Sequence, residues 1–230
     1  MEKYTYLAIN LCSISIPFIA SFYKKKAFYK DWKPYFIANF IVIFFFILWD
    51  SIFTHLKIWG FNPRYLTGIN ILNLPLEEVL FFICIPYSSV FIYFSIDYFF
   101  RLTFIDKYEK YITLLLLIIL SFIGVLFYFK LYTSITFLLL SCLLFFVYIK
   151  NINMGKIYFS YLVILVPFFI VNGILTGSFI DEEVVWYNNN HNLQIRLGTI
   201  PIEDAFYGFL LIASIILIYE KLKLKFHKTV

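Results

Sequence analysis

One four-residue motif occurs twice in the sequence, as Pro75-Leu76-Glu77-Glu78 and as Pro201-Ile202-Glu203-Asp204. Each copy opens a long apolar run. Proline fits the first position of a helix, because the amide proton that it lacks would have no partner there. The acidic pairs that follow are unusual, because ionisable groups beside a hydrocarbon layer are costly and usually serve a function. These acids are therefore the main candidates for chemistry, and we expect a catalytic set of Glu77, Glu78, Glu203 and Asp204.

Two explanations fit acids in a first helical turn. An isolated pair can simply complement the helix dipole, which is worth up to ~1 kcal/mol at an exposed position. The repetition, and the absence of Lys and Arg from the same turns, favour a shared site. If the copies meet in an apolar pocket, repulsion between like charges keeps a proton on at least one carboxyl group, which makes it a general acid. Adjacent helical residues point about 100° apart, so one acid of each pair should face the pocket, but the sequence leaves open which one.

The composition is that of an integral membrane protein. Of 230 residues, 62% are hydrophobic and 14% are charged, whereas about 25% of residues are charged in soluble domains. The mean hydropathy is +0.85. The net charge of +5 lies in connecting segments, which indicates membrane topology and argues against nucleic acid as a partner.

Apolar runs of membrane-spanning length recur along the whole chain. The sequence therefore predicts an all-α membrane protein, a single membrane domain over residues 1–230, with seven transmembrane helices. Their expected ranges are 4–23, 34–54, 75–96, 111–129, 131–149, 157–177 and 201–220.

The basic residues are distributed unevenly between the two sides of this topology. The segments after the first, third and fifth helices and the C-terminal tail carry 14 Lys and Arg, and the remaining segments carry 5. Basic residues accumulate in cytoplasmic loops. We therefore expect a multi-pass protein of the cell membrane, in contact with membrane lipid, with its N-terminus outside and its C-terminus in the cytoplasm.

The sequence also resembles an internal duplication. The motif copies lie 126 residues and four expected helices apart, and residues 50–54 before the first copy resemble residues 172–176 before the second. We expect a first repeat at 1–96, a connector helix at 111–129 and a second repeat at 131–220. An even offset makes the repeats parallel, so both acidic pairs should begin their helices at the same membrane face and converge on one pocket.

Several other residues are weaker candidates for binding substrate or supporting the acids. Asp50 and Asn172 are expected at helix ends facing the same loops, where they can join a hydrogen-bond network or serve as plain helix-end polar residues. The arginines could orient a carboxylate or contact lipid headgroups, and the tryptophans could line the pocket mouth or belong to the interfacial belt. The full supporting set is Asp50, Arg64, Asn172, Arg196, Trp49 and Trp186. His55 and His191 lack a metal-binding pattern, and we expect no metal.

A repeated P-x-E-(E/D) motif at the start of membrane helices, in a small all-helical chain with two similar halves, resembles the FAD-independent membrane lycopene cyclases. The resemblance covers nearly the whole chain and is to the fused form of a two-subunit enzyme. It implies that the motif acids take part in catalysis and that the partner is lycopene or a related acyclic carotenoid. It also implies ring closure of an acyclic ψ end to a β-ionone ring without a redox cofactor. Association with other enzymes of carotenoid synthesis is a further expectation.

Two other classes of seven-helix protein are alternatives. A retinal protein needs a lysine inside the bundle, and residues 201–219 contain none. A proton-coupled transporter of a small apolar or amphipathic solute is the stronger rival, because parallel repeats and intramembrane acids are typical of carriers. Carriers usually place such acids near the bilayer midplane, whereas these lie within about one turn, ~5 Å, of a helix start.

Overall fold

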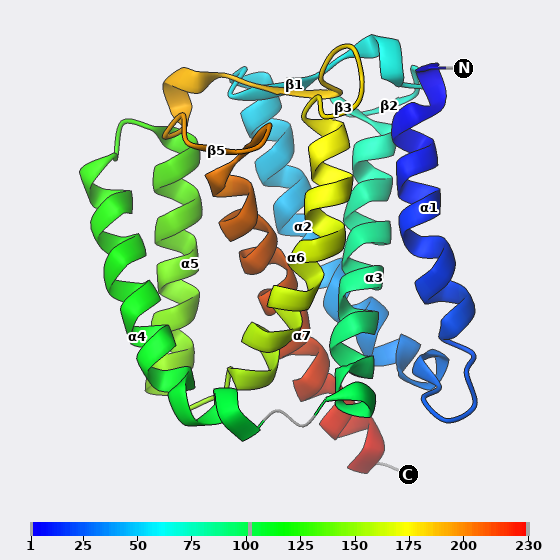
Figure 1. The fold of residues 1–230 in the computed structure, drawn as a ribbon, viewed down its shortest axis with the longest axis vertical. Coiled ribbons are helices and arrows are strands. Elements are labelled where there is room, and N and C mark those ends of the chain that lie inside the picture. The colour runs from blue at the N-terminus through cyan, green and yellow to red at the C-terminus, as the bar shows by residue number, and fades with distance from the viewer. Residues whose placement is uncertain (1, 101–102, 229–230) are drawn as a thin grey trace.

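The computed structural model describes residues 2–100 and 103–228. Within these residues seven α-helices form a bundle (Figure 1). Their bounds are α1 Thr5–Ala20, α2 Trp32–His55, α3 Leu76–Phe99, α4 Thr103–Leu126, α5 Leu131–Ile149, α6 Gly155–Leu175 and α7 Ile202–Lys228. The chain ends lie at opposite ends of the bundle, and α3 and α7 begin at the same end, as an even helix offset requires (Figure 1).

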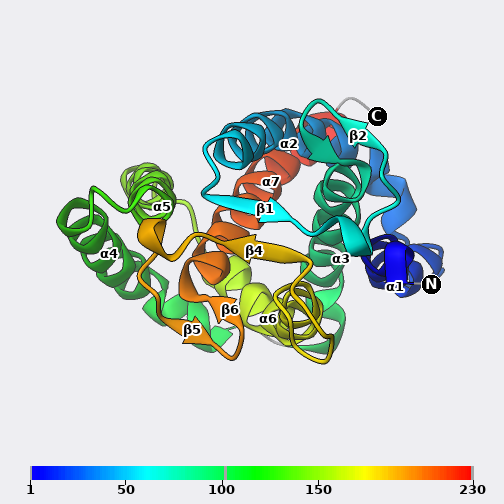
Figure 2. The same ribbon diagram turned by 90° about the horizontal axis from the view of Figure 1, so that it is seen from above.

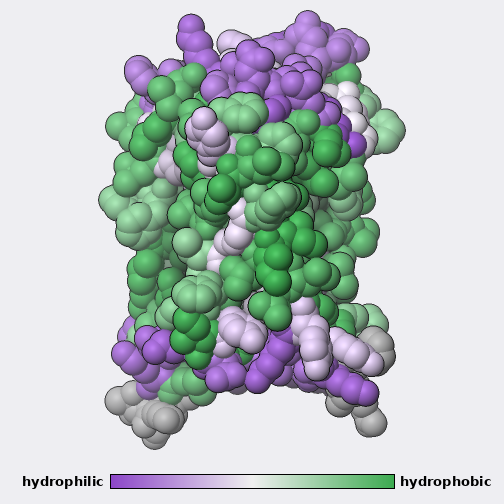
Figure 3. Space-filling model, turned by 90° about the vertical axis from the view of Figure 1, so that its left-hand side faces the viewer, coloured by the Kyte–Doolittle hydropathy of each residue, from purple (hydrophilic) through white to green (hydrophobic). Residues whose placement is uncertain are grey.

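Six of these helices, α2 to α7, are long and apolar enough to span a bilayer. The first helix has 16 residues and ends at Ala20, earlier than the expected 23, because the chain turns at Ser21 and Phe22. At 1.5 Å per residue it is about 24 Å long, less than the ~30 Å hydrocarbon layer. On the face that Figure 3 shows, an apolar belt lies between two hydrophilic ends, as expected for a multi-pass membrane protein.

Several helix starts differ from the sequence-based expectation. The structure begins α3 at Leu76 and α7 at Ile202, one residue after the prolines that were expected at the first helical position. Pro75 has an extended backbone and pairs with Asn70 in a short hairpin, a position that suits a residue without an amide proton. The fourth helix begins at Thr103, before the expected 111, because its polar first turns are also helical.

Short strands connect the helices at the end where α3 and α7 begin. They are β1 Trp59–Phe61, β2 Asn70–Ile71, β3 Leu74–Pro75, β4 Val185–Tyr187, β5 Arg196–Leu197 and β6 Ile200–Pro201. The β2–β3 and β5–β6 hairpins precede α3 and α7, and every residue of one hairpin lies 126 positions from its equivalent in the other. Their turns share a left-handed residue, Leu72 (φ 59°) in the first and Gly198 (φ 67°) in the second, which is strained only for the leucine.

The strands β1 and β4 pair with each other across the chain. Gly60 lies opposite Trp186, again an offset of 126, and Trp59 lies opposite Tyr187. Figure 2 shows the two strands crossing above the bundle between α2 and α6. A side chain at position 60 would overlap the indole ring of Trp186, so glycine is required for this close approach. The ladder covers one end of the bundle.

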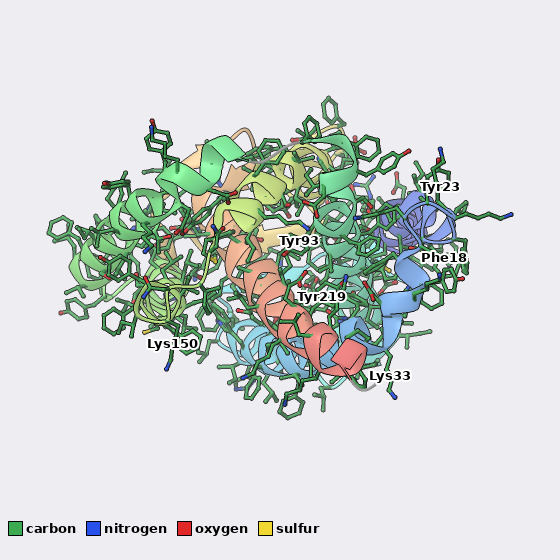
Figure 4. The ribbon with its side chains drawn as sticks, turned by 90° about the horizontal axis from the view of Figure 1, so that it is seen from below. Phe18, Tyr23, Lys33, Tyr93, Lys150 and Tyr219 are labelled. Atoms are coloured by element: carbon green, nitrogen blue, oxygen red, sulfur yellow. The ribbon has the colours of Figure 1, made fainter. Side chains whose placement is uncertain are left out.

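The opposite end of the bundle is closed by polar contacts. The Tyr219 hydroxyl donates to Asp31 (2.9 Å), and Lys223 forms a 2.6 Å ion pair with the same carboxylate. Lys156 lies 4.2 Å from the centre of the Tyr93 ring. Figure 4 shows Tyr93 and Tyr219 toward the middle of this end, whereas Lys33, Lys150 and Tyr23 lie at its edge.

Candidate active site

A cavity of about 160 Å³ lies beneath the β1–β4 ladder and extends into the bundle. Its lining on α3 runs from Glu78 to Ile92, a distance of about 21 Å at 1.5 Å per residue, and α6 lines it over a similar length. The cavity is therefore narrow and elongated. The lining reaches the outer surface at Pro167, which is exposed. We call this space the chamber. Its lining residues include Tyr6, Asp50, Trp59, Glu78, Tyr132, Pro167, Asn172, Tyr187, Asp204 and Tyr207.

Only the second acid of each motif lines the chamber. Glu78 and Asp204 are 8% and 5% exposed and both belong to its wall. Glu77 and Glu203 are fully buried and are not among the lining residues. This division follows from helix geometry, because neighbouring residues point about 100° apart. It answers which acid of each pair faces the pocket.

The first acids fasten the loops that precede their helices. Glu77 accepts a hydrogen bond from the backbone N–H of Thr67 (2.7 Å), and Glu203 accepts one from Leu193 (2.7 Å). Each donor lies ten residues before its acid. Glu203 also accepts from the Thr133 hydroxyl (2.6 Å). We refer to Glu77 and Glu203 as the outer acids, and to Glu78 and Asp204 as the inner acids.

Each inner acid accepts a hydrogen bond from a tyrosine on the first helix of its half. Tyr6 of α1 donates to Glu78 Oε2 (2.5 Å), and Tyr132 of α5 donates to Asp204 Oδ1 (2.6 Å). Both pairs are separated by 72 residues, so the two arrangements are equivalent in the sequence.

Asp204 has two further donors, and Glu78 has none. Asn172 Nδ2 and the Tyr187 hydroxyl donate to Asp204 Oδ2 at 2.7 and 2.9 Å. Within the described residues, Glu78 Oε1 accepts no hydrogen bond from the protein. Burial, together with the Asp204 carboxylate, raises the pKa of Tyr187 well above its usual value, so this tyrosine stays a neutral donor.

A third carboxyl group, Asp50, belongs to the chamber wall. The Trp59 indole N–H donates to Oδ1, and Thr54 lies 3.5 Å from the same oxygen. Asp50 is 2% exposed, and in the part of the chain that the structure describes its Oδ2 has no hydrogen-bond partner. The chamber thus holds three carboxyl groups, with no Lys, Arg or His among the described lining residues.

Aromatic rings form much of the remaining wall. Tyr132 stacks on Tyr187 with ring centres 5.9 Å apart and planes 14° apart, and Trp59 packs edge-on against Tyr132 at 5.1 Å. The faces of such rings attract positive charge. A chamber with carboxyl groups, aromatic faces and no basic side chain in its described lining is suited to a cationic species.

Comparison with protein families shows which family the chain belongs to. The family model for lycopene cyclase matches residues 3–96 and 129–222. The chain belongs to the lycopene cyclase family. The two matched segments are offset by 126 residues, as the motifs are. No curated protein and no solved structure matches the chain. Family membership supports a carotenoid cyclase function, a carotenoid substrate and a role in carotenoid biosynthesis.

The structure places the arginines of this lycopene cyclase family member away from the chamber. Arg64 was expected as a possible partner of a motif acid, but it pairs with Glu2 (2.7 Å) and Asp181 (3.0 Å) and lies near Glu182 on the outer surface. Arg196 donates to the Thr199 carbonyl and to an asparagine side chain within its own loop. Neither arginine contacts an inner or outer acid.

The remaining supporting residues divide between the chamber and its surroundings. Asp50 and Asn172 both line the chamber, where Asn172 donates to Asp204 and Asp50 accepts from Trp59. Trp186 lies on the other side of the β1–β4 ladder, over Gly60. Trp49 packs against Tyr207, with ring centres 4.9 Å apart, and so stands behind the wall.

Sequence reasoning missed the tyrosines and the threonine that bind the acids. These residues lie outside the motifs, on α1, α5 and β4: Tyr6, Tyr132, Thr133 and Tyr187. The sequence does contain a signal for Tyr6 and Tyr132, because these two tyrosines lie 126 residues apart, as the motifs do. Among the described residues, no group of three or more His, Cys, Asp and Glu could hold a metal ion.

Proposed function

We propose that this family member is a lycopene β-cyclase that closes a β-ionone ring at an acyclic ψ end by acid–base chemistry. A proton adds to C2 of the terminal double bond and leaves a cation at C1. The C5=C6 double bond attacks, so that the C1–C6 bond forms and the cation moves to C5. Loss of the proton on C6 restores the double bond. One proton enters and one leaves, so the reaction is an isomerisation that consumes no redox equivalents.

The observation that carries this proposal is the meeting of Glu78 and Asp204 in one aromatic chamber. A protonated carboxyl group out of bulk water is a general acid, and the rings and carboxylates can stabilise the cation that follows. The four motif acids are all part of the proposed site. The inner acids face the substrate, and the outer acids position the loops and helix starts that carry them.

The shape of the chamber supports a polyene substrate. A narrow space about 21 Å long matches a linear conjugated chain better than a compact solute. The ψ end would lie at the inner acids, and the rest of the chain would extend along α3 and α6 toward the surface at Pro167. A carotenoid is dissolved in the bilayer, so access from the lipid side avoids transfer through water.

Two parallel three-helix repeats, joined by α4, are part of the proposal. The offset of 126 residues in the motifs, hairpins and tyrosine–acid pairs supports it. The excess of basic residues at the opposite end supports an outward-facing N-terminus, which would place the inner acids near the outer face.

Expression in a lycopene-accumulating bacterial host tests the function. We expect pigment with one or two β rings from the wild type, retained lycopene from Glu78→Gln, and normal conversion from Glu2→Gln, an exposed control. Glu203→Gln tests the outer acid of the second copy. A well-folded wild-type protein that leaves lycopene unchanged would contradict the proposal, and proton-driven movement of a solute by that protein would favour a transporter.

A further inference from the structure

The inner acids differ in how many donors hold them. Asp204 accepts from Tyr132, Asn172 and Tyr187, whereas Glu78 accepts only from Tyr6. Hydrogen bonds donated to a carboxylate stabilise its charged form. Three such bonds favour an ionised Asp204, and one bond leaves Glu78 more easily protonated.

The polar residues on the helices that precede the two motifs add to this difference. Asp50 and Asn172 occupy similar stretches before the two motifs, and both line the chamber. The amide of Asn172 donates to Asp204 and so stabilises its charge. The similar stretch of the first copy carries a carboxyl group, Asp50, in the same chamber as Glu78, and a second carboxyl group in a shared apolar space opposes the ionisation of the first. The surroundings of Glu78 in the first copy therefore favour its protonated form, and those of Asp204 in the second copy favour its ionised form.

We infer that Glu78 is the proton donor and that Asp204 stays ionised as the counter-charge of the carbocation. This assignment rests on the proposed cyclase function. Glu78 Oε1 has no protein partner among the described residues and can present its proton to C2. Asp204 has both oxygens engaged, so it acts as a fixed charge.

The cycle closes without a further reactant. Glu78 gives its proton to C2, the C1–C6 bond forms, and the cation moves to C5. C2 and C6 are both bonded to C1 and so flank the same ring atom, which brings C6 close enough for the Glu78 carboxylate to take its proton. Glu78 ends protonated and Asp204 ends ionised, as at the start, and no electrons are exchanged.

Infrared difference spectroscopy of the full-length protein in detergent tests the assignment independently of turnover. The carbonyl band of protonated carboxyl groups should lose a component in Glu78→Gln at neutral pH. The same component should persist in Asp204→Asn, whose spectrum should lose carboxylate absorption instead. Glu2→Gln, at an exposed site, should leave the protonated-carboxyl band unchanged. A band that is lost in Asp204→Asn and kept in Glu78→Gln would overturn the assignment.

A second variant keeps the test decisive if Asp204→Asn does not fold. Asn172→Asp retains the side-chain size and places a second carboxyl group within hydrogen-bond distance of Asp204. We expect an additional protonated-carboxyl component, and its absence would overturn the assignment.

The pigment assay distinguishes failure of the role assignment from failure of the proposed function. A wild type that forms rings while the bands fail to follow the prediction refutes only the division of roles, and a wild type that forms no rings refutes the function.

Discussion

The first and second motif copies hold their outer acids by the same backbone contact and their inner acids by different sets of donors. The backbone N–H ten residues before each outer acid donates to it at 2.7 Å in both copies. The inner acids share one tyrosine partner at equivalent positions, but Asn172 and Tyr187 are donors to Asp204 only.

In the proposed mechanism this difference gives two copies of one motif different chemical roles. The loops and helix starts position each carboxyl group, and the number of hydrogen-bond donors determines whether it is protonated or charged. A change at one donor position is then expected to alter the chemistry without altering the backbone.

The largest expected effect separates the two acids of the first copy. Glu78→Gln removes the proposed donor, and general acid catalysis is worth about 10²–10⁴-fold in rate, so ring formation should fall at least about 100-fold. Glu77→Gln should reduce activity much less, because this side chain lies outside the chamber. The measurement is product formed per folded enzyme in membranes supplied with lycopene. Equal losses in the two variants would contradict the division into inner and outer acids.

Asp204→Asn should have the next largest effect. It removes a fixed charge that stabilises a cation, and removal of one such group typically costs about 10²-fold. Asp204→Glu keeps the charge and serves as the matched control, with partial recovery expected. Full activity in Asp204→Asn would show that the second copy supplies no charge to the reaction.

The equivalent tyrosines give a sharper comparison. Tyr6→Phe removes the only protein donor to Glu78 in the described residues, whereas Tyr132→Phe leaves Asp204 with two donors. A hydrogen bond to a charged group is worth about 1.5–3 kcal/mol, so Tyr6→Phe should lower the rate about tenfold or more. Tyr132→Phe should cost only a few-fold. A larger fall in initial rate for Tyr132→Phe than for Tyr6→Phe would indicate that the remaining donors to Asp204 do not compensate for the loss of Tyr132.

The outer acids also differ by one contact, and the effect is on stability. Thr133 donates to Glu203, and the equivalent position in the first half is Leu7. Thr133→Val should lower the free energy of unfolding by about 1 kcal/mol, or the melting temperature by about 2–4 °C. Leu7→Val removes one methylene at the equivalent position without removing a hydrogen bond, so it reports the sensitivity of this position to packing, and thermal melting in detergent compares the two. An equal fall in both would assign the loss to packing.

The smallest effect is expected at the outer surface. Arg64 joins Glu2 to Asp181, and its hydrogen bond to Glu2 lowers the pKa of that carboxyl group. A lowered pKa in the folded state stabilises the fold above the pKa of the unfolded chain, and this contribution is lost as the pH falls through the folded value. Exposed pairs contribute little and are screened by salt. Arg64→Ala should therefore give a slight fall in melting temperature at neutral pH that vanishes in high salt or acid, with Arg196→Ala as the control.

Much of the architecture could be predicted from local sequence. Apolar runs define helices because a backbone in lipid must satisfy its own hydrogen bonds. The expected helix ranges 111–129 and 131–149 leave only a short connection at Lys130, and the structure begins α5 at Leu131 as expected. The positions of both motifs at helix starts were also correct to one residue.

The contacts that complete the site could not be predicted in the same way. The chain contains 19 tyrosines, so no single one indicates a partner for an acid 72 residues away. The strands β1 and β4 have three residues each and pair over more than 120 positions, and strands this short leave no periodic pattern. The choice between adjacent acids depends on helix rotation about its axis, which the sequence of one helix does not fix.

The narrow, elongated shape of the chamber has a consequence for the number of rings in the product. If lycopene is the substrate, a narrow and elongated chamber admits the molecule one end at a time. The end that has formed a ring must leave the chamber before the opposite end can enter. A doubly closed pigment then requires two separate dockings in opposite directions. The one-ring compound would be released between them, and its share of the total should fall as the enzyme is given more time or made more abundant.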